Sequence, residues 1–327
     1  MDTRTLGRTG LQVSRLTFGC GAVGGLMTKG RPEDQLRAVE RALDLGVNFI
    51  DTAALYGNGA SETNVGRILK QLKPDIVLGT KVRVAPHDKH DIGNAITRSL
   101  EQSLSRLQRD HVDLLQLHNT LSTAGEEWNL SPEIVLEEVV PVFERLKRDG
   151  KIRFFGMTAI GETPALRKVV DAGAFDTAQI VYNLLNPSAG GPVAKDFTGQ
   201  DYDGLLARAA AAGMGTIVIR VLAGGALSAQ MDRHPLGMQN VAPIGSGKDY
   251  GSDVERARDM AAALSPSAGK DIVETAIRYV VSHPDVTTLQ VGMATVEQFE
   301  GAASAVNKGP LEASVLGTIS EMQSGAA

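Results

Sequence analysis

The chain has 327 residues and a mass of 34.6 kDa, and 43% of its residues are hydrophobic, which is enough for a large buried core. A formal net charge of −5, with Lys and Arg spread along the chain, disfavours a nucleic-acid partner or an anionic membrane surface. Cys20 is the only cysteine, which excludes an intrachain disulfide, and neither a signal peptide nor a membrane-spanning apolar run is recognisable. We therefore expect a soluble, cytoplasmic protein.

Short apolar runs alternate along the chain with longer segments of helical period, the pattern of βα units and a parallel sheet. A small hairpin with two Gly-centred turns is predicted first, over residues 4–14. The predicted strands then cover residues 15–21, 47–52, 75–82, 111–119, 152–158, 177–183, 215–221 and 286–292. The clearest helices are predicted over residues 32–46, 61–72, 91–108 and 132–150.

Eight βα units without a linker predict a single domain over residues 1–327, a closed (β/α)8 TIM barrel rather than an open sheet. The run "GCGAVGG" at 19–25 is Gly-rich, but alone it is weak evidence for an open dinucleotide-binding fold. The hairpin is expected to close the floor of the barrel. Residues 222–253, rich in Gly and polar side chains, are predicted to form a long loop after the seventh strand, as a lid or binding loop.

Polar side chains stand at the ends of three neighbouring predicted strands. Asp51 and Tyr56 follow the second strand, Lys81 ends the third and His118 ends the fourth, so the four can converge at the active-site face of a barrel. A lysine ammonium lowers the pKa of a nearby phenol from about 10, and Asp51 would keep Lys81 charged. Neutral His118 could orient a carbonyl oxygen. Such a group exchanges a proton with a carbonyl or hydroxyl oxygen, and a hydride donor must come from outside.

The sequence resembles the aldo-keto reductases over nearly its whole length. The segment "DTAALYGNGASETNVG" at 51–66 follows the family pattern, and "LGTKV" and "VDLLQLH" match the family's lysine and histidine strands. The resemblance implies an NAD(P)-dependent oxidoreductase on a (β/α)8 barrel that acts on a small aldehyde, ketone or sugar. It also implies a catalytic tetrad of Asp51, Tyr56, Lys81 and His118, with Tyr56 as general acid/base. "GMTAIG" and "VGMATVEQ" look most like the branch with NAD-using sugar dehydrogenases such as L-galactose dehydrogenase.

The resemblance further implies that Thr158 and Gln179 bind the nicotinamide carboxamide, although Ala159 stands where Asn is usual. After the seventh strand, the family's stacking aromatic residue and Ser-Pro-Leu are replaced by a segment that includes Arg220 and Leu222. An arginine here could reach the pyrophosphate or stack as a planar cation.

Residues 291–304 resemble the family's adenosine-phosphate segment, with Gly292, Thr295 and Gln298 at binding positions and Ala302 where an adenine-binding Asn is usual. Members that prefer NADP often have a Lys or Arg near the position of Thr295, and residues 291–304 contain neither. Because the 2′-phosphate of NADP needs basic partners, we expect NAD to be used at least comparably with NADP.

Several other residues allow more than one interpretation. Trp128, in the loop after the fourth strand, could line the substrate pocket or pack at its rim. His87 and His90 could hold a metal, but a solvated loop is favoured and we predict no metal site. Cys20 is expected to be a small buried hydrophobe rather than a reactive thiol. Two other functions stay open: a nucleotide-binding regulatory subunit like the potassium-channel β subunits, and a metal-dependent barrel hydrolase or isomerase that uses His87, His90 and His118.

Overall fold

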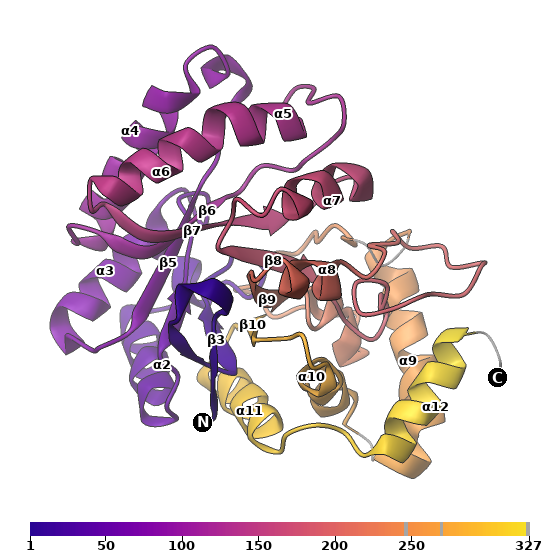
Figure 1. The fold of residues 1–327 in the computed structure, drawn as a ribbon. Coiled ribbons are helices and arrows are strands. Elements are labelled where there is room, and N and C mark those ends of the chain that lie inside the picture. The colour runs from indigo at the N-terminus through magenta and orange to yellow at the C-terminus, as the bar shows by residue number, and fades with distance from the viewer. Residues whose placement is uncertain (245–247, 269–270, 325–327) are drawn as a thin grey trace.

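The computed structural model describes residues 1–244, 248–268 and 271–324 (Figure 1). Eight parallel strands close into a barrel in the order β10-β3-β4-β5-β6-β7-β8-β9. The barrel strands are β3 (Leu16–Gly19), β4 (Phe49–Asp51), β5 (Val77–Val82), β6 (Val112–Leu117), β7 (Ile152–Ala159), β8 (Thr177–Val181), β9 (Gly215–Ile219) and β10 (Thr288–Gly292). Each strand pairs with its predecessor and β10 returns to pair with β3, so the predicted (β/α)8 barrel is confirmed.

Helices surround the barrel and bury one face against it (Figure 1). In α4, for example, buried Ile92, Ile96, Leu100 and Leu104 recur every fourth residue and form an apolar stripe. The helices that follow the barrel strands are α2 (Pro32–Asp44), α3 (Ala60–Leu72), α4 (Ile92–Leu107), α6 (Val140–Arg148), α7 (Thr163–Asp171), α8 (Leu205–Ala211), α10 (Ile272–Ser282) and α11 (Val296–Asn307). Four more were not predicted as separate helices: α1 (Leu26–Lys29), α5 (Pro132–Ile134), α9 (Tyr250–Ala268) and α12 (Ala313–Ser324).

The helix predicted over 132–150 is present but contains a wider turn. After α5, residues Val135–Val139 form a π-helical turn, and Val140 N bonds to Val135 O before α6 continues. Pro141 explains the turn, because proline has no backbone N–H and its ring collides with the preceding turn of a regular α-helix.

The hairpin at the start of the chain closes the floor of the barrel, as predicted. Its strands β1 (Thr3–Thr5) and β2 (Gln12–Ser14) pair antiparallel. Leu6 and Val13 are fully buried, and they share a small apolar cluster with Phe49, Val77, Leu114 and Ile217 from the barrel interior. Gly7 has a φ of +50°, and a Cβ there would lie 2.2 Å from Gly215 N, so the turn rests directly against the start of β9.

The segment after β9 differs from the single long loop predicted over 222–253. It contains a 3-10 helix, η4 (Ala223–Ser228), and the start of α9, and residues 245–247 lie outside the described residues. Gly224 and Gly225 have φ of 70° and 112°, which lets the chain turn twice within η4. A second long connection, over residues 182–204 between β8 and α8, was not predicted.

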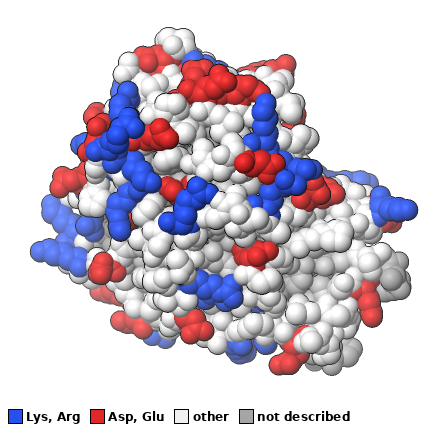
Figure 2. Space-filling model, viewed as in Figure 1, with Lys and Arg blue, Asp and Glu red and all other residues white. Residues whose placement is uncertain are grey.

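The surface carries both signs of charge. On the face shown in Figure 2, Lys and Arg side chains are interspersed with Asp and Glu. Among the helices of the described residues, none is both long enough and apolar enough to cross a membrane.

Candidate active site

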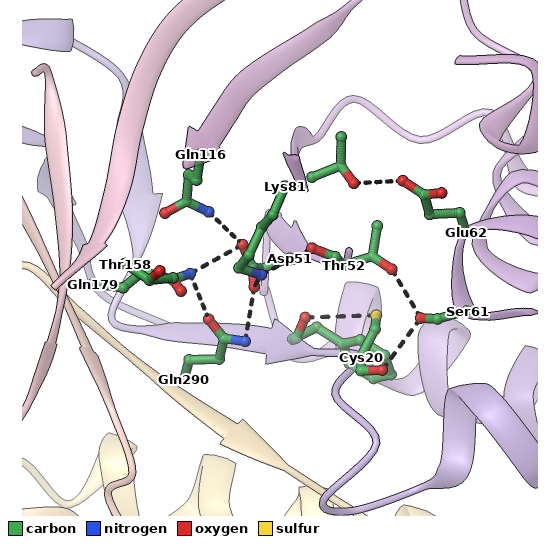
Figure 3. Close-up of polar contacts among 12 residues, drawn as sticks. Cys20, Asp51, Thr52, Ser61, Glu62, Lys81, Gln116, Thr158, Gln179 and Gln290 are labelled. Atoms are coloured by element: carbon green, nitrogen blue, oxygen red, sulfur yellow. Dashed lines mark hydrogen bonds and ion pairs between the residues drawn. The ribbon is translucent and has the colours of Figure 1, made fainter. Parts of the chain in front are cut away.

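Four polar side chains form one layer of the barrel interior at the carboxyl ends of the strands (Figure 3). Asp51, Gln116, Gln179 and Gln290 come from the alternate strands β4, β6, β8 and β10, one from each. In (β/α)8 barrels, each interior layer of side chains is built from alternate strands in this way. Asp51 is fully buried. It accepts hydrogen bonds from Nε2 of Gln116 at 2.7 Å, of Gln290 at 2.8 Å and of Gln179 at 3.1 Å. These amides satisfy a carboxylate that water cannot reach.

Lys81, on β5, is buried beside this layer. Its ammonium forms an ion pair with Asp51 and donates to Thr52 O at 2.8 Å. Burial acts to lower the pKa of Lys81, but the Asp51 carboxylate and the Tyr56 phenol raise it above the ordinary value. Lys81 is therefore a cation at neutral pH.

Tyr56 lies between the lysine and the histidine. Its ring centre is 4.9 Å from Lys81 Nζ and 5.7 Å from the His118 ring, which it meets edge-on at 86°. Burial raises the pKa of Tyr56 above its ordinary value, while the Lys81 ammonium acts to lower it. The effect of the lysine predicted from the sequence is present, but burial outweighs it.

The loop that carries Tyr56 is anchored by residues whose partners were not identified from the sequence. Ser61 N donates to Tyr56 O at 3.2 Å, which ties the loop to the start of α3. The next residue, Glu62, is fully buried and accepts from Thr80 Oγ1 at 2.5 Å and from Arg106 Nε at 2.6 Å. Arg106 comes from α4, so only the folded barrel brings this buried ion pair together.

His118 follows β6 and completes the predicted group of four. Burial lowers the pKa of His118 to about 3, and the charges of Lys81 and Arg83 act in the same direction. The ring is therefore neutral at ordinary pH. Its buried Nδ1 has no hydrogen-bond partner among the described residues, so the protein leaves part of its hydrogen-bonding capacity unused.

Trp128 lies over a cation at the edge of this site. The Arg83 guanidinium is 4.4 Å from the Trp128 ring centre, and the tryptophan is 45% exposed. Asn119 Nδ2 donates to Trp128 O at 3.0 Å and so ties the loop to the end of β6. Asn129 lines a recess of about 480 Å³ between the segments that follow β6, β7 and β8. Trp128 itself does not line this recess, and its exposure places it at the surface rather than in the packed interior.

Two predicted nicotinamide contacts lie beside the tetrad. Thr158 and Gln179 are register partners on β7 and β8, and both are buried. Thr158 Oγ1 donates to Leu117 O at 3.0 Å. Gln179 uses Nε2 toward Asp51, and no described residue donates to its Oε1.

Arg220, directly after β9, has a φ of +59°, and among the described residues its guanidinium donates one weak hydrogen bond, from Nη1 to Ala242 O at 3.4 Å. Burial lowers the pKa of Arg220, and Tyr56 and Tyr202 act to raise it. Leu222 is partly buried at the start of η4.

The other predicted cofactor residues lie where β10 passes into α11. Gly292 ends the strand, and Thr295 caps the helix by accepting from Gln298 N at 3.3 Å. Gln298 Oε1 accepts from Ala294 N at 2.8 Å. The side chains of Thr295 and Gln298 therefore form hydrogen bonds within the turn between β10 and α11.

Arg37 was not identified from the sequence. It lies on α2, and its Nη2 is 3.9 Å from Glu297 Oε1 in the first turn of α11 and 3.4 Å from Asp34 Oδ1. The pairing of β10 with β3 closes the barrel and brings α2 against α11. Arg37 thus lies near residues 291–304, which contain no Lys or Arg. The carboxylates of Asp34 and Glu297 offset its positive charge.

The histidine-rich segment gives no support to a metal site. His87 lies in a 3-10 turn, η2 (Pro86–Asp88), with 82% of its side chain exposed. In the part of the chain that the structure describes, no three His, Cys, Asp or Glu side chains are grouped to hold a metal ion. Cys20 is buried as expected, and burial raises the pKa of its thiol.

Comparison with known proteins agrees with this geometry. The profile of the "Aldo/keto reductase family" matches residues 15–324. L-galactose dehydrogenase of Arabidopsis thaliana is 28% identical over 313 residues, 94% of this chain and 89% of that protein. A solved aldo-keto reductase of Bacillus halodurans in its holo form is 25% identical, with a TM-score of 0.75, and covers 100% of this chain and 98% of that one.

A Klebsiella pneumoniae aldo/keto reductase in complex with NADP and acetate shares the fold, with a TM-score of 0.69 at 21% identity, over 98% of this chain and 95% of that one. The profile match extends from the first barrel strand to the last helix, and the barrel closes as the resemblance implied. The chain therefore belongs to the aldo/keto reductase family.

Proposed function

We propose that this protein is an NAD(P)-dependent oxidoreductase that interconverts a carbonyl and an alcohol, with Tyr56 as general acid/base. The observation that carries the proposal is the position of Lys81, a buried cation held by Asp51 and 4.9 Å from the centre of the Tyr56 ring. An ammonium in this position stabilises the phenolate as it forms, which is the property a phenol needs in order to exchange protons near neutral pH.

The residues present fit a nicotinamide dinucleotide. Gln179 Oε1 and Thr158 Oγ1 can accept hydrogen bonds from a carboxamide, because Oε1 has no donor among the described residues and Oγ1 donates elsewhere. Arg220 has spare donors for a pyrophosphate, next to Leu222. Gly292, Thr295 and Gln298 would hold the adenosine end at the start of α11. When bound, the nicotinamide supplies or accepts the hydride.

The chain's own residues divide the proton chemistry among them. In reduction, the Tyr56 hydroxyl gives its proton to the substrate oxygen; in oxidation, the phenolate takes a proton from the hydroxyl. Lys81 stabilises the phenolate, and Asp51 keeps Lys81 charged and in place. Neutral His118 would hold the same substrate oxygen with Nε2, which has no partner among the described residues. We propose that the substrate is an aldehyde, a ketone or a sugar, and that Trp128 borders it.

Nucleotide binding and turnover test the proposal separately. Quenching of protein fluorescence by NADH or NADPH should saturate, and a panel of aldoses and small aldehydes should include a substrate that oxidises the bound nucleotide. Saturable binding without turnover of any carbonyl would favour a regulatory subunit instead. A metal requirement, shown by loss of activity with a chelator, would favour a barrel hydrolase or isomerase.

A further inference from the structure

Gln290 reaches Asp51 by crossing a neighbouring strand. It lies on β10, Asp51 lies on β4, and β3 runs between them. The crossing is possible because Gly19 on β3 has no side chain: a Cβ there would lie 2.8 Å from Gln290 Cγ and 3.2 Å from its Nε2. Gly19 is also the register partner of both Asp51 and Gly292. The absence of a side chain at Gly19 thus leaves room for the amide of Gln290 to reach the carboxylate, a contact drawn in Figure 3.

The amide of Gln290 is held at both ends. Its Nε2 donates to Asp51 Oδ2 at 2.8 Å, the same oxygen that pairs with Lys81. Its Oε1 accepts from Gln179 Nε2 at 3.2 Å, and Gln179 also donates to Asp51 Oδ1 at 3.1 Å. The three side chains form a closed ring of hydrogen bonds, so the donor end of Gln290 can only face Asp51.

We propose that Gln290 is a positioning residue that disperses the charge of Asp51 and so favours the phenolate form of Tyr56. The inference rests on the function proposed above. The N–H groups of Gln290 place positive charge density on Asp51 Oδ2, which weakens the negative potential of the carboxylate at Tyr56. They also compete with Lys81 for that oxygen, which leaves the ammonium freer to interact with the phenol. Without the amide, Asp51 would have a stronger negative potential at Tyr56 and would hold Lys81 more tightly. Both changes disfavour the phenolate.

Several charged or titratable groups act on Tyr56 from different elements. They are Asp51 on β4, Lys81 on β5, Cys20 after β3, His118 after β6 and Arg220 after β9. Cys20 is a neutral thiol in a buried site, and His118 is neutral. Among these groups, Asp51 is the one that the amide of Gln290 contacts, and Lys81 pairs with the same Asp51 oxygen, so a change at Gln290 acts on Tyr56 through that pair.

The test replaces Gln290 by methionine, which keeps the length of the side chain and removes the amide. The matched control is Thr288→Val, on the same strand, which deletes the buried hydrogen bond between the Thr288 and Thr17 hydroxyls, 2.9 Å apart, without touching Asp51. Two readouts are compared at one mildly alkaline pH: kcat for alcohol oxidation, and the rate at which tetranitromethane nitrates Tyr56, followed by peptide mass spectrometry. Both depend on the phenolate fraction, but nitration needs no turnover.

Gln290→Met should lower both rates about threefold or more, as expected for an upward pKa shift of roughly half a unit, while Thr288→Val stays at the wild-type level. Equal rates in Gln290→Met and wild type, or an equal fall in Thr288→Val, would overturn the inference. If Gln290→Met does not fold, Gln290→Leu serves the same comparison. If the wild-type protein oxidises no alcohol with either nucleotide, the proposed function fails, and the nitration rates still decide the role of Gln290.

Discussion

The carboxyl ends of β4, β5 and β6 and the segments after β9 and β10 contribute to one candidate site but are built differently. In the first region, Asp51 is fully buried and accepts from a lysine and three glutamines. In the second, the Arg220 guanidinium donates a single weak hydrogen bond within the described part of the chain, to a backbone oxygen, and the Gln298 side chain is engaged only by its own turn. The first region is preassembled before any ligand binds, and the second holds donors that a ligand can use. Substitutions in the first should therefore change turnover, and those in the second should change nucleotide affinity.

The largest effect is expected at Tyr56. Tyr56→Phe keeps the ring between Lys81 and His118 but removes the proton, so kcat should fall at least about 10²-fold while the dissociation constant of the nucleotide stays within a few-fold. Steady-state kinetics and fluorescence titration measure the two quantities. Tyr279→Phe is the control, because it deletes a phenol that bonds to Gln323 and has no part in the site. Near-normal turnover in Tyr56→Phe would remove Tyr56 from the mechanism.

A smaller change is expected in the pH dependence when the lysine is replaced. Because the Lys81 ammonium acts to lower the pKa of Tyr56, Lys81→Met should move the rise of alcohol oxidation to higher pH, by roughly one unit, with about a tenfold loss at a fixed pH below the midpoint. The pH–rate profile measures this shift. Lys147→Met, which also removes a lysine from an aromatic ring and from a carboxylate, should leave the profile in place. An unshifted profile in Lys81→Met would contradict the coupling.

Arg220 tests the second region. Arg220→Leu removes donors that we assign to the pyrophosphate, so the dissociation constants of NADH and NADPH should both rise about tenfold, and the difference from wild type should shrink at high salt. Arg208→Leu, which breaks a surface ion pair with Asp171, is the control and should bind nucleotide normally. If kcat fell steeply in Arg220→Leu with nucleotide affinity unchanged, Arg220 would belong with the proton-transfer group instead.

The smallest difference is expected between the two nucleotides. Residues 291–304 contain no Lys or Arg, and the nearby Arg37 is offset by Asp34 and Glu297, so the dissociation constants of NADH and NADPH should agree within about tenfold. A preference for NADPH of about a hundredfold, roughly 2.7 kcal/mol, would contradict this expectation. Arg37→Leu would then show whether this arginine is the missing phosphate contact.

Much of the fold could be predicted from the sequence, because local patterns determine it. Alternating strand and helix periods identified each barrel strand, and the Gly-centred turns of 4–14 identified the hairpin. The π-turn before Pro141 could be anticipated only as a weakness in the helix, since its form depends on how the neighbouring turns pack. The connection over 182–204 was missed although Pro187, Gly190, Gly191 and Pro192 mark a turn-rich segment within it.

The candidate site divides in the same way. Asp51, Tyr56, Lys81 and His118 could be placed because they lie at the ends of three consecutive strands or in the loop directly after one of them. Gln116 and Gln290 had a usable signal, since each interrupts an apolar strand, and Gln116 has the same parity as inward-facing Leu114. Arg106 and Arg37 had none: each meets its partner through helix packing between segments far apart in the chain, which no local pattern encodes.

The closed floor of the barrel has a kinetic consequence. Because Leu6 and Val13 fill the space beneath the strands, nothing can enter or leave by that end. Under the proposed function, nucleotide and substrate would both enter through the opening at the other end, where the predicted nicotinamide contact Gln179 is buried and Trp128 is exposed. We therefore expect the nucleotide to bind before the carbonyl substrate and to leave after the alcohol product, an order that product-inhibition kinetics would test.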